Sequence, residues 1–236
     1  MKSNIKIRPH QTTLLVAGFA TLAGFLVPIL RQLLLPVLYL NTHLHELSHA
    51  LTAQATGADV EKILVNANGG GVTPIVGGNI LIVASAGYLG ATVFGAAMLY
   101  FGRSEKSARS MLATLAVLLT FSMVVWVRGD VVGEISGAGW ICALALMSMF
   151  LKQGWLMFSC QFLGLQQCLN SFQSLFTLVK ISAETEVHSD ASILQSNTGI
   201  PSLIWALGWA VFSLVMVAWS LKLSWKPAPK TSKRGS

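Results

Sequence analysis

The chain consists of successive long apolar stretches, separated by short segments that contain glycine, proline or a few charged residues. A helix crosses a bilayer with about 20 mostly apolar residues, and these stretches have about that length. Only 11% of the 236 residues are charged. A soluble domain needs roughly a quarter of its residues charged to cover its surface. The outer surface of this chain is therefore expected to face lipid.

The apolar stretches predict an all-α membrane protein, a polytopic transmembrane helix bundle of about six to seven spans. The approximate ranges of the stretches are 12–30, 33–56, 80–101, 111–127, 137–151, 154–179 and 200–223. Between the second and the third, two short apolar runs flank Gly69-Gly70-Gly71, a pattern that predicts a short membrane-associated β-hairpin. We expect one membrane domain over residues 1–225 and a basic, disordered tail over 226–236.

Basic residues gather near both ends of the chain. They are Lys2, Lys6, Arg8, Lys226, Lys230, Lys233 and Arg234. Basic segments beside apolar helices are typical of contact with an anionic lipid leaflet. No basic face or aromatic platform accompanies them in the sequence, so nucleic acid is not an expected partner. The expected partner is the lipid bilayer, and the expected location is a multi-pass position in a cell membrane of the bacterial type.

The most informative motif is His45-Glu46-Leu47-Ser48-His49, an HExxH pattern in the second predicted helix. Residues four apart on a helix share a face, so His45 and His49 can bind one metal ion. Glu46 can then accept a proton from a water that the metal activates. Histidine and glutamate are costly to bury in a membrane, which argues against a chance match. The motif predicts a Zn²⁺ site with Glu46 as the general base.

The third zinc ligand is less directly indicated. A catalytic zinc ion normally has three protein ligands, so His45 and His49 leave one to be found. Asp190 is the preferred candidate, because Ser189 can cap a helix that starts there and carries the carboxylate close to the membrane. His188 remains an alternative, since imidazole also suits zinc.

The motif resembles that of a known family. Residues 45–50, followed by Thr56-Gly57, resemble the site-2 protease family of intramembrane zinc metalloproteases, in its compact branch without PDZ domains. The resemblance covers roughly residues 33–102 and 189–209. Better-known members take the third zinc ligand from an Asp-Gly pair, which this chain lacks. The compact branch uses a pattern like Ser189-Asp190-Ala191.

The resemblance implies a fold, a substrate class and an orientation. It implies that the chain cuts transmembrane helices of other proteins, and that the glycine-rich hairpin binds the substrate as an added strand. Gly70, Val72 and Ile75 are the residues expected to contact the substrate. It also implies that the His49 end of its helix faces the cytosol.

Two other functions remain open from the sequence. One is a non-enzymatic membrane scaffold or chaperone of the same fold, which would bind helices without cutting them. The other is a membrane metal carrier, with His45 and His49 as a transit site. Glu46 favours hydrolysis, because a transit site needs no general base beside its ligands. We therefore predict a zinc metalloendopeptidase.

Overall fold

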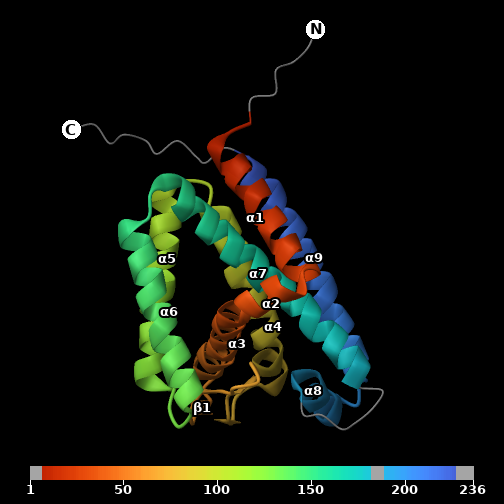
Figure 1. Cartoon of the computed structure of the whole chain (residues 1–236). Helices are drawn as coiled ribbons and strands as arrows, with labels where there is room; N and C mark the ends of the chain where they lie inside the picture. Colours follow the sequence, from red (N-terminus) through yellow and green to blue (C-terminus); the bar gives the residue numbers. More distant parts are fainter. Residues whose placement is uncertain (1–6, 182–188, 227–236) are drawn as a thin grey trace, which may run out of the picture.

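The computed structural model describes residues 7–181 and 189–226 and is mostly helical (Figure 1). Two pairs of very short strands interrupt the helices between α3 and α4. The elements are α1 (Pro9–Leu26), α2 (Pro28–Leu33), α3 (Leu35–Ala55), β1 (Asp59–Val60), β2 (Leu64–Val65), β3 (Gly71–Val72), β4 (Ile75–Val76), α4 (Ile80–Phe101), α5 (Glu105–Val125), α6 (Val131–Phe150), α7 (Gln153–Ile181), α8 (Asp190–Thr198) and α9 (Ser202–Trp225).

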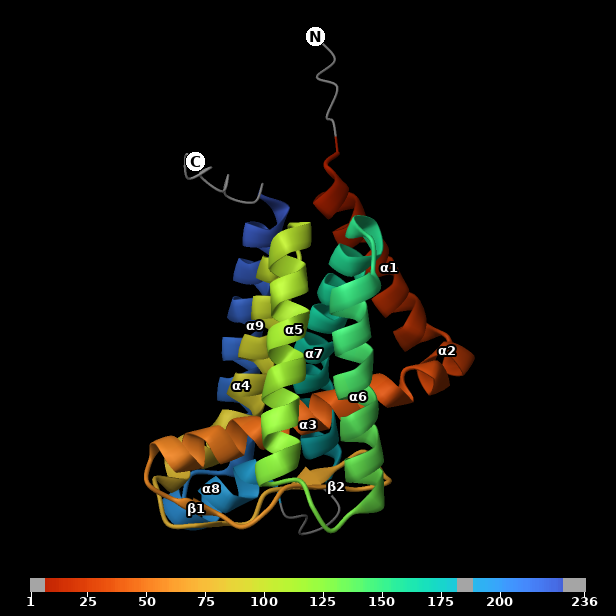
Figure 2. The same cartoon turned by 90° about the vertical axis from the view of Figure 1, so that its left-hand side faces the viewer.

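Four of the described helices, α4, α5, α6 and α9, are long and apolar enough to cross a membrane. They run lengthwise between the two ends of the molecule (Figures 1 and 2). Many of their large apolar side chains are exposed, Val124 of α5 at 79% among them, as expected for helices in contact with lipid. The count of six to seven spans stays a prediction.

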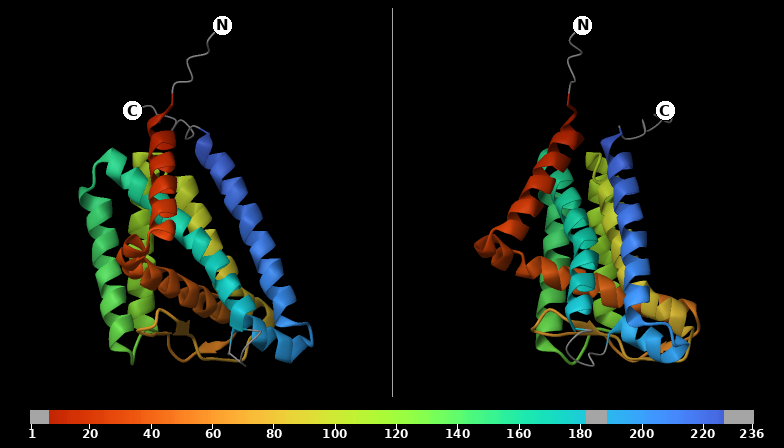
Figure 3. Two further views of the ribbon diagram at one scale, coloured as in Figure 1. Left: turned by 45° about the vertical axis from the view of Figure 1, so that its right-hand side comes forward. Right: turned by 90° about the vertical axis from the view of Figure 1, so that its right-hand side faces the viewer.

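Helix α3 lies across the other helices instead of beside them (Figures 2 and 3). Two breaks precede it, because Pro28 begins α2 after α1 has ended, and Pro36 lies in the first turn of α3. Proline is accepted in a first helical turn but does not continue a preceding helix, so each proline marks a change of direction. The stretch expected as a second span thus becomes a crossing helix inside the bundle.

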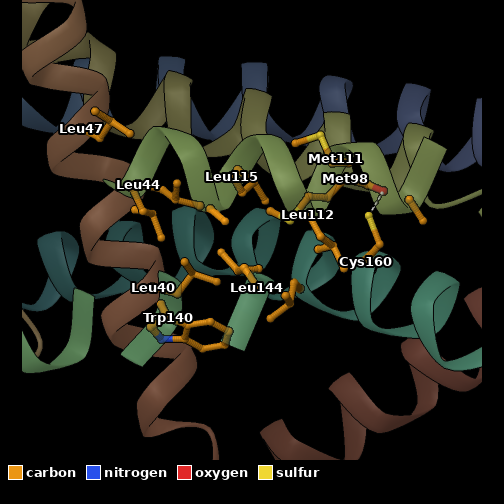
Figure 4. Packing of buried hydrophobic residues seen from close by; sticks show 14 of the residues in the cluster. Leu40, Leu44, Leu47, Met98, Met111, Leu112, Leu115, Trp140, Leu144 and Cys160 are labelled. Atoms are coloured by element: carbon orange, nitrogen blue, oxygen red, sulfur yellow. Dashed lines mark hydrogen bonds between the residues drawn. The ribbon is translucent and has the colours of Figure 1, made fainter. Parts of the chain in front are cut away.

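One stripe of α3 belongs to the main hydrophobic core. Leu40, Leu44 and Leu47 follow the three- and four-residue spacing of a helix face and are almost completely buried. They pack with leucines of α5 and α6, among them Leu115 and Leu144 (Figure 4). This packing fixes the rotation of α3 about its axis and leaves the side chains of His45, Glu46 and His49 to face other neighbours.

The segment between α3 and α4 forms two short antiparallel pairs. In the inner pair Leu64 lies opposite Val72, and in the outer pair Val60 lies opposite Ile75. The turn of the inner pair uses Gly69 at φ 84°, a backbone conformation that favours glycine. The segment lies at the same end of the molecule as α8, opposite the start of α1 and the end of α9 (Figure 2). Its association with the membrane stays a prediction.

Candidate metal centre

Three predicted metal ligands converge from two helices far apart in sequence. The Nε2 atoms of His45 and His49, one turn apart on α3, lie 3.1 Å from each other. The Oδ2 atom of Asp190, in the first turn of α8, lies 3.2 Å from Nε2 of His45 and 3.3 Å from Nε2 of His49. These three residues are the only potential metal-binding group found among the residues that the structure describes.

The spacing of these atoms fits a zinc ion. Two donors that each lie about 2.0–2.1 Å from a tetrahedral zinc are roughly 3.3–3.4 Å apart, close to all three separations seen here. The Nδ1 atom of His49 donates a hydrogen bond to the carbonyl of Val83 at 2.7 Å. In the neutral imidazole this leaves a lone pair on Nε2, directed toward the carboxylate. Histidines that bind zinc typically donate a hydrogen bond from the far ring nitrogen in this way, so the three atoms are compatible with a bound metal ion.

Aromatic rings fix the other histidine. The ring of His45 meets Tyr88 of α4 edge to face at a centroid distance of 4.8 Å. Tyr88 in turn stacks on Trp209 of α9 at 4.9 Å. Edge-to-face and offset contacts of this kind favour one ring orientation. The imidazole is therefore held by packing as well as by Asp190.

Gly87 makes room for both imidazoles. A Cβ atom at this position of α4 would collide with the Nε2 atoms of His45 and His49. The atoms that the Cβ would meet are the Nε2 donor atoms themselves. The two rings cannot easily move aside, because Val83, Tyr88 and Asp190 already hold them. The small residue at position 87 is thus required by the position of the two imidazole rings and not only by helix packing.

We expect Gly87→Ala to lower bound zinc strongly, because the added methyl group occupies the space between the two donor nitrogens. Zinc per purified protein, measured by atomic emission, tests this. Gly139→Ala is the matched control, since a Cβ at this helical glycine of α6 has no atom within 4 Å. Equal zinc content in both variants would contradict the assignment of this space to the metal centre.

Asp190 is placed by the start of α8. Ser189 caps this helix, as predicted, and forms a reciprocal capping box with Ser192. Ala191 and Leu194 of α8 pack on Ala84 and Trp209, which anchors the helix beside the centre. Burial alone would raise the pKa of the Asp190 carboxyl, whereas His49 and His45, when they carry a proton, hold this pKa well below its usual range. His188 lies outside the described residues.

Glu46 faces a different neighbour from the histidines. It is 4% exposed, and its Oε2 atom accepts a hydrogen bond of 2.7 Å from the hydroxyl of Thr73. Its Oε1 atom lies beside Gly71, where a Cβ atom would approach it to 2.6 Å. Glu46 is not a member of the three-residue group, which fits the predicted role as a base better than a role as a ligand.

The three residues expected to contact substrate lie in the β segment, close in sequence to Gly71 and Thr73, which are the neighbours of Glu46. Val72 belongs to β3, directly after Gly71, and is 47% exposed. Gly70 lies in the turn before β3 and is exposed, whereas Ile75 belongs to β4 and packs against a small cluster formed by Ala53, Ala58 and Val83. Their role in substrate binding stays a prediction.

Sequence reasoning missed several groups that support the centre. Nothing in the sequence marks the carbonyl of Val83 as the partner of His49, because every residue has a carbonyl. Thr73 carried a weak signal, as a hydroxyl two residues after the triple glycine. Tyr88, next to Gly87, was recognisable only as part of an apolar helix. All three are assigned by packing across helices.

The comparison with known families agrees with this geometry. The Peptidase M50B-like family matches residues 15–220, a range that contains all three converging ligands and Glu46. The chain belongs to this family. Membership in the Peptidase M50B-like family confirms the site-2 protease-like resemblance and, with the four apolar helices, identifies an integral membrane protein of a metallopeptidase family. No curated protein and no solved structure matches the chain.

Proposed function

We propose that this M50B-like protein is an intramembrane zinc metalloprotease that hydrolyses peptide bonds in or near transmembrane segments of other membrane proteins. The observation that carries the proposal is the convergence, within 3.3 Å of one another, of two imidazole nitrogens of α3, the helix that also carries Glu46, with one carboxylate oxygen of α8. We place its activity in a cell membrane of the bacterial type, as the sequence suggested.

His45, His49 and Asp190 would hold the zinc ion, which when bound lowers the pKa of water from about 15.7 toward 7 and polarises a carbonyl group. Glu46 accepts the proton of the attacking water and then delivers it to the amide nitrogen. The hydroxyl adds to the carbonyl carbon and the C–N bond breaks, so one water is consumed and a carboxylate and an amine are produced. Thr73 holds Oε2 of Glu46, which leaves Oε1 as the atom to take the proton.

The short strand β3 supplies the surface for the substrate. It pairs with β2 along one edge, and its other edge lies outside that pair. An extended peptide can add to such an edge through backbone hydrogen bonds, which requires that the substrate helix unwinds locally. Gly71 lets the backbone of β3 approach Glu46 closely. A strand bound here by Gly70, Val72 and Ile75 would therefore lie beside the base.

A cysteine at Val72 is expected to crosslink to a substrate helix held on an inactive Glu46→Gln variant, because this exposed side chain follows the glycine at the base. Val124→Cys on α5 serves as the control, being still more exposed but on a different element. Cys142, which is exposed, is replaced by alanine in both. Crosslinks from position 124 with none from position 72 would remove β3 from the substrate site.

The function itself is tested on purified protein in two steps. Zinc is first measured per chain, and cleavage of a transmembrane helix peptide in detergent or lipid is then followed by mass spectrometry, with and without a chelator. One zinc per chain with chelator-sensitive cleavage supports the protease. Stable helix binding without cleavage would support a scaffold or chaperone, and zinc movement across a vesicle membrane without cleavage would support a carrier.

A further inference from the structure

The basic residues of this protein are distributed unevenly between its two ends. The terminal end comprises the start of α1, the α4–α5 and α6–α7 connections and the last turn of α9, and the site end comprises the β segment, the α5–α6 connection and α8 (Figures 1 and 2). Side-chain contacts support both groupings. Arg103 donates to the carbonyl of Leu223 at the terminal end, and Arg128 donates to the carbonyl of Glu61 at the site end.

Among the described residues, the terminal end has more than twice as many lysines and arginines as the site end. Those of the terminal end are Arg8, Arg103, Lys106, Arg109, Lys152, Lys222 and Lys226, and those of the site end are Lys62, Arg128 and Lys180. Arg31 belongs to α2, which lies between the two ends, and is counted with neither (Figure 2). The acidic residues show the reverse bias, with Glu105 at the terminal end and with Asp59, Glu61, Asp130, Glu134 and Asp190 at the site end. In the sequence, Lys2 and Lys6 precede α1, and Lys230, Lys233 and Arg234 follow α9.

Helix capping does not explain this asymmetry. Some of the arginines do bind helix C-terminal carbonyls, as Arg109 does with Leu151 at 3.3 Å. However, the helices α4, α6 and α9 finish at the terminal end, and α3, α5 and α7 finish at the site end. Cations that served only to complement helix dipoles would be needed equally at both ends. The bias therefore has another cause.

The membrane supplies that cause. Short loops rich in lysine and arginine stay on the cytoplasmic side of a bilayer, and the bias in these residues sets the orientation of the whole protein. We infer that the terminal end faces the cytoplasm and that the metal centre opens toward the opposite, non-cytoplasmic side. This is the reverse of the orientation that the family resemblance implies. It also leaves both basic chain termini on the cytoplasmic side, because α1 begins and α9 finishes at the same end (Figure 3).

The orientation narrows the class of substrate, and this step rests on the proposed function. Glu46, β3 and Asp190 all lie toward the site end, so a bound strand would come from the part of a substrate helix nearest the non-cytoplasmic surface. Suitable substrates are membrane proteins whose helices unwind easily at that surface. Cleavage would release a fragment to the outside and leave the greater part of the helix in the membrane.

The orientation is tested by labelling intact bacterial cells with a membrane-impermeant maleimide. The full chain carries Glu46→Gln and Cys142→Ala, so that labelling is independent of catalysis, and Cys160 and Cys168 are too buried to react. Ala67→Cys reports the site end, and Gln153→Cys is its matched control at the terminal end. Both positions are exposed and uncharged.

We expect Ala67→Cys to be labelled fully in intact cells, and Gln153→Cys only after the membrane has been permeabilised. Labelling of Gln153→Cys in intact cells, alone or together with Ala67→Cys, would overturn the inferred orientation, as would an Ala67→Cys that reacts only after permeabilisation. Cut sites mapped with the active protein test the substrate class separately. The expected labelling without any cleavage would reject the protease and leave the orientation intact.

Discussion

Replacement of Glu46 by glutamine is expected to slow peptide-bond hydrolysis by about 10²–10⁴, the usual effect of losing a general base. Zinc content should stay unchanged, because Glu46 is not among the three converging ligands. Glutamine keeps the size of the side chain and can still accept the hydrogen bond from Thr73, so the local fold is preserved. The measurement is the rate of cleavage of a transmembrane peptide at saturating substrate, together with zinc per chain.

Glu61→Gln is the matched control, since it makes the same chemical change at an exposed residue whose structural contact is made by the backbone carbonyl. It should cleave at the rate of the unmodified protein. A Glu46→Gln protein that cleaves at full rate would reject Glu46 as the base. A Glu46→Gln protein that has lost its zinc would show that the carboxylate acts at the metal instead.

Replacement of Asp190 by asparagine should weaken zinc binding more than the roughly 10–100-fold typical of residues that only support a ligand. Cleavage should disappear with the metal. Asparagine has the shape of aspartate but lacks the negative charge that faces the two Nε2 atoms at 3.2 and 3.3 Å. The dissociation constant for zinc, measured by competition with a chelating dye, tests this directly.

Two variants complete the Asp190 experiment. Asp59→Asn removes a carboxylate of similar chemistry from an exposed position and should leave zinc affinity unchanged. His188→Ala should also keep zinc, because Asp190 completes the set of three. Full zinc affinity in Asp190→Asn together with a loss in His188→Ala would exchange the roles of the two residues.

The sequence was most informative where chemistry depends on local spacing. The HExxH pattern put His45 and His49 on one helical face, and the structure has both on α3 with their Nε2 atoms 3.1 Å apart. The cap at Ser189 was also readable, because a serine before a helix start has a local signature. Both inferences need only a few consecutive residues. The roles of His45, His49, Asp190 and Glu46 in zinc binding and catalysis stay predictions, which the experiments above test.

What could not be read from the sequence depends on the arrangement of whole helices. Residues 33–56 were expected to form an ordinary span, and only the packing of Leu40 and Leu44 against neighbouring helices makes α3 a crossing helix. The same holds for the contact of Thr73 with Glu46, which joins residues 27 positions apart. Such contacts leave no periodic pattern, because each is made once, between elements whose relative position the sequence does not encode locally.

The distance in sequence between the ligands sets an order of events during synthesis. His45 and Asp190 are 145 residues apart, so a ribosome has made α3 through α7 before the proposed third ligand exists. Until then the growing chain offers two imidazoles, one donor short of the three that a catalytic zinc normally has. The segment between His45 and Asp190 is long, so bringing its two ends together has an entropic cost. Metal sites of this kind rarely form ahead of the fold that contains them. On the proposed ligand set, α8 therefore acts as a safeguard: a newly inserted chain is expected to stay inert toward neighbouring membrane proteins until α8 has been made and has packed beside α3.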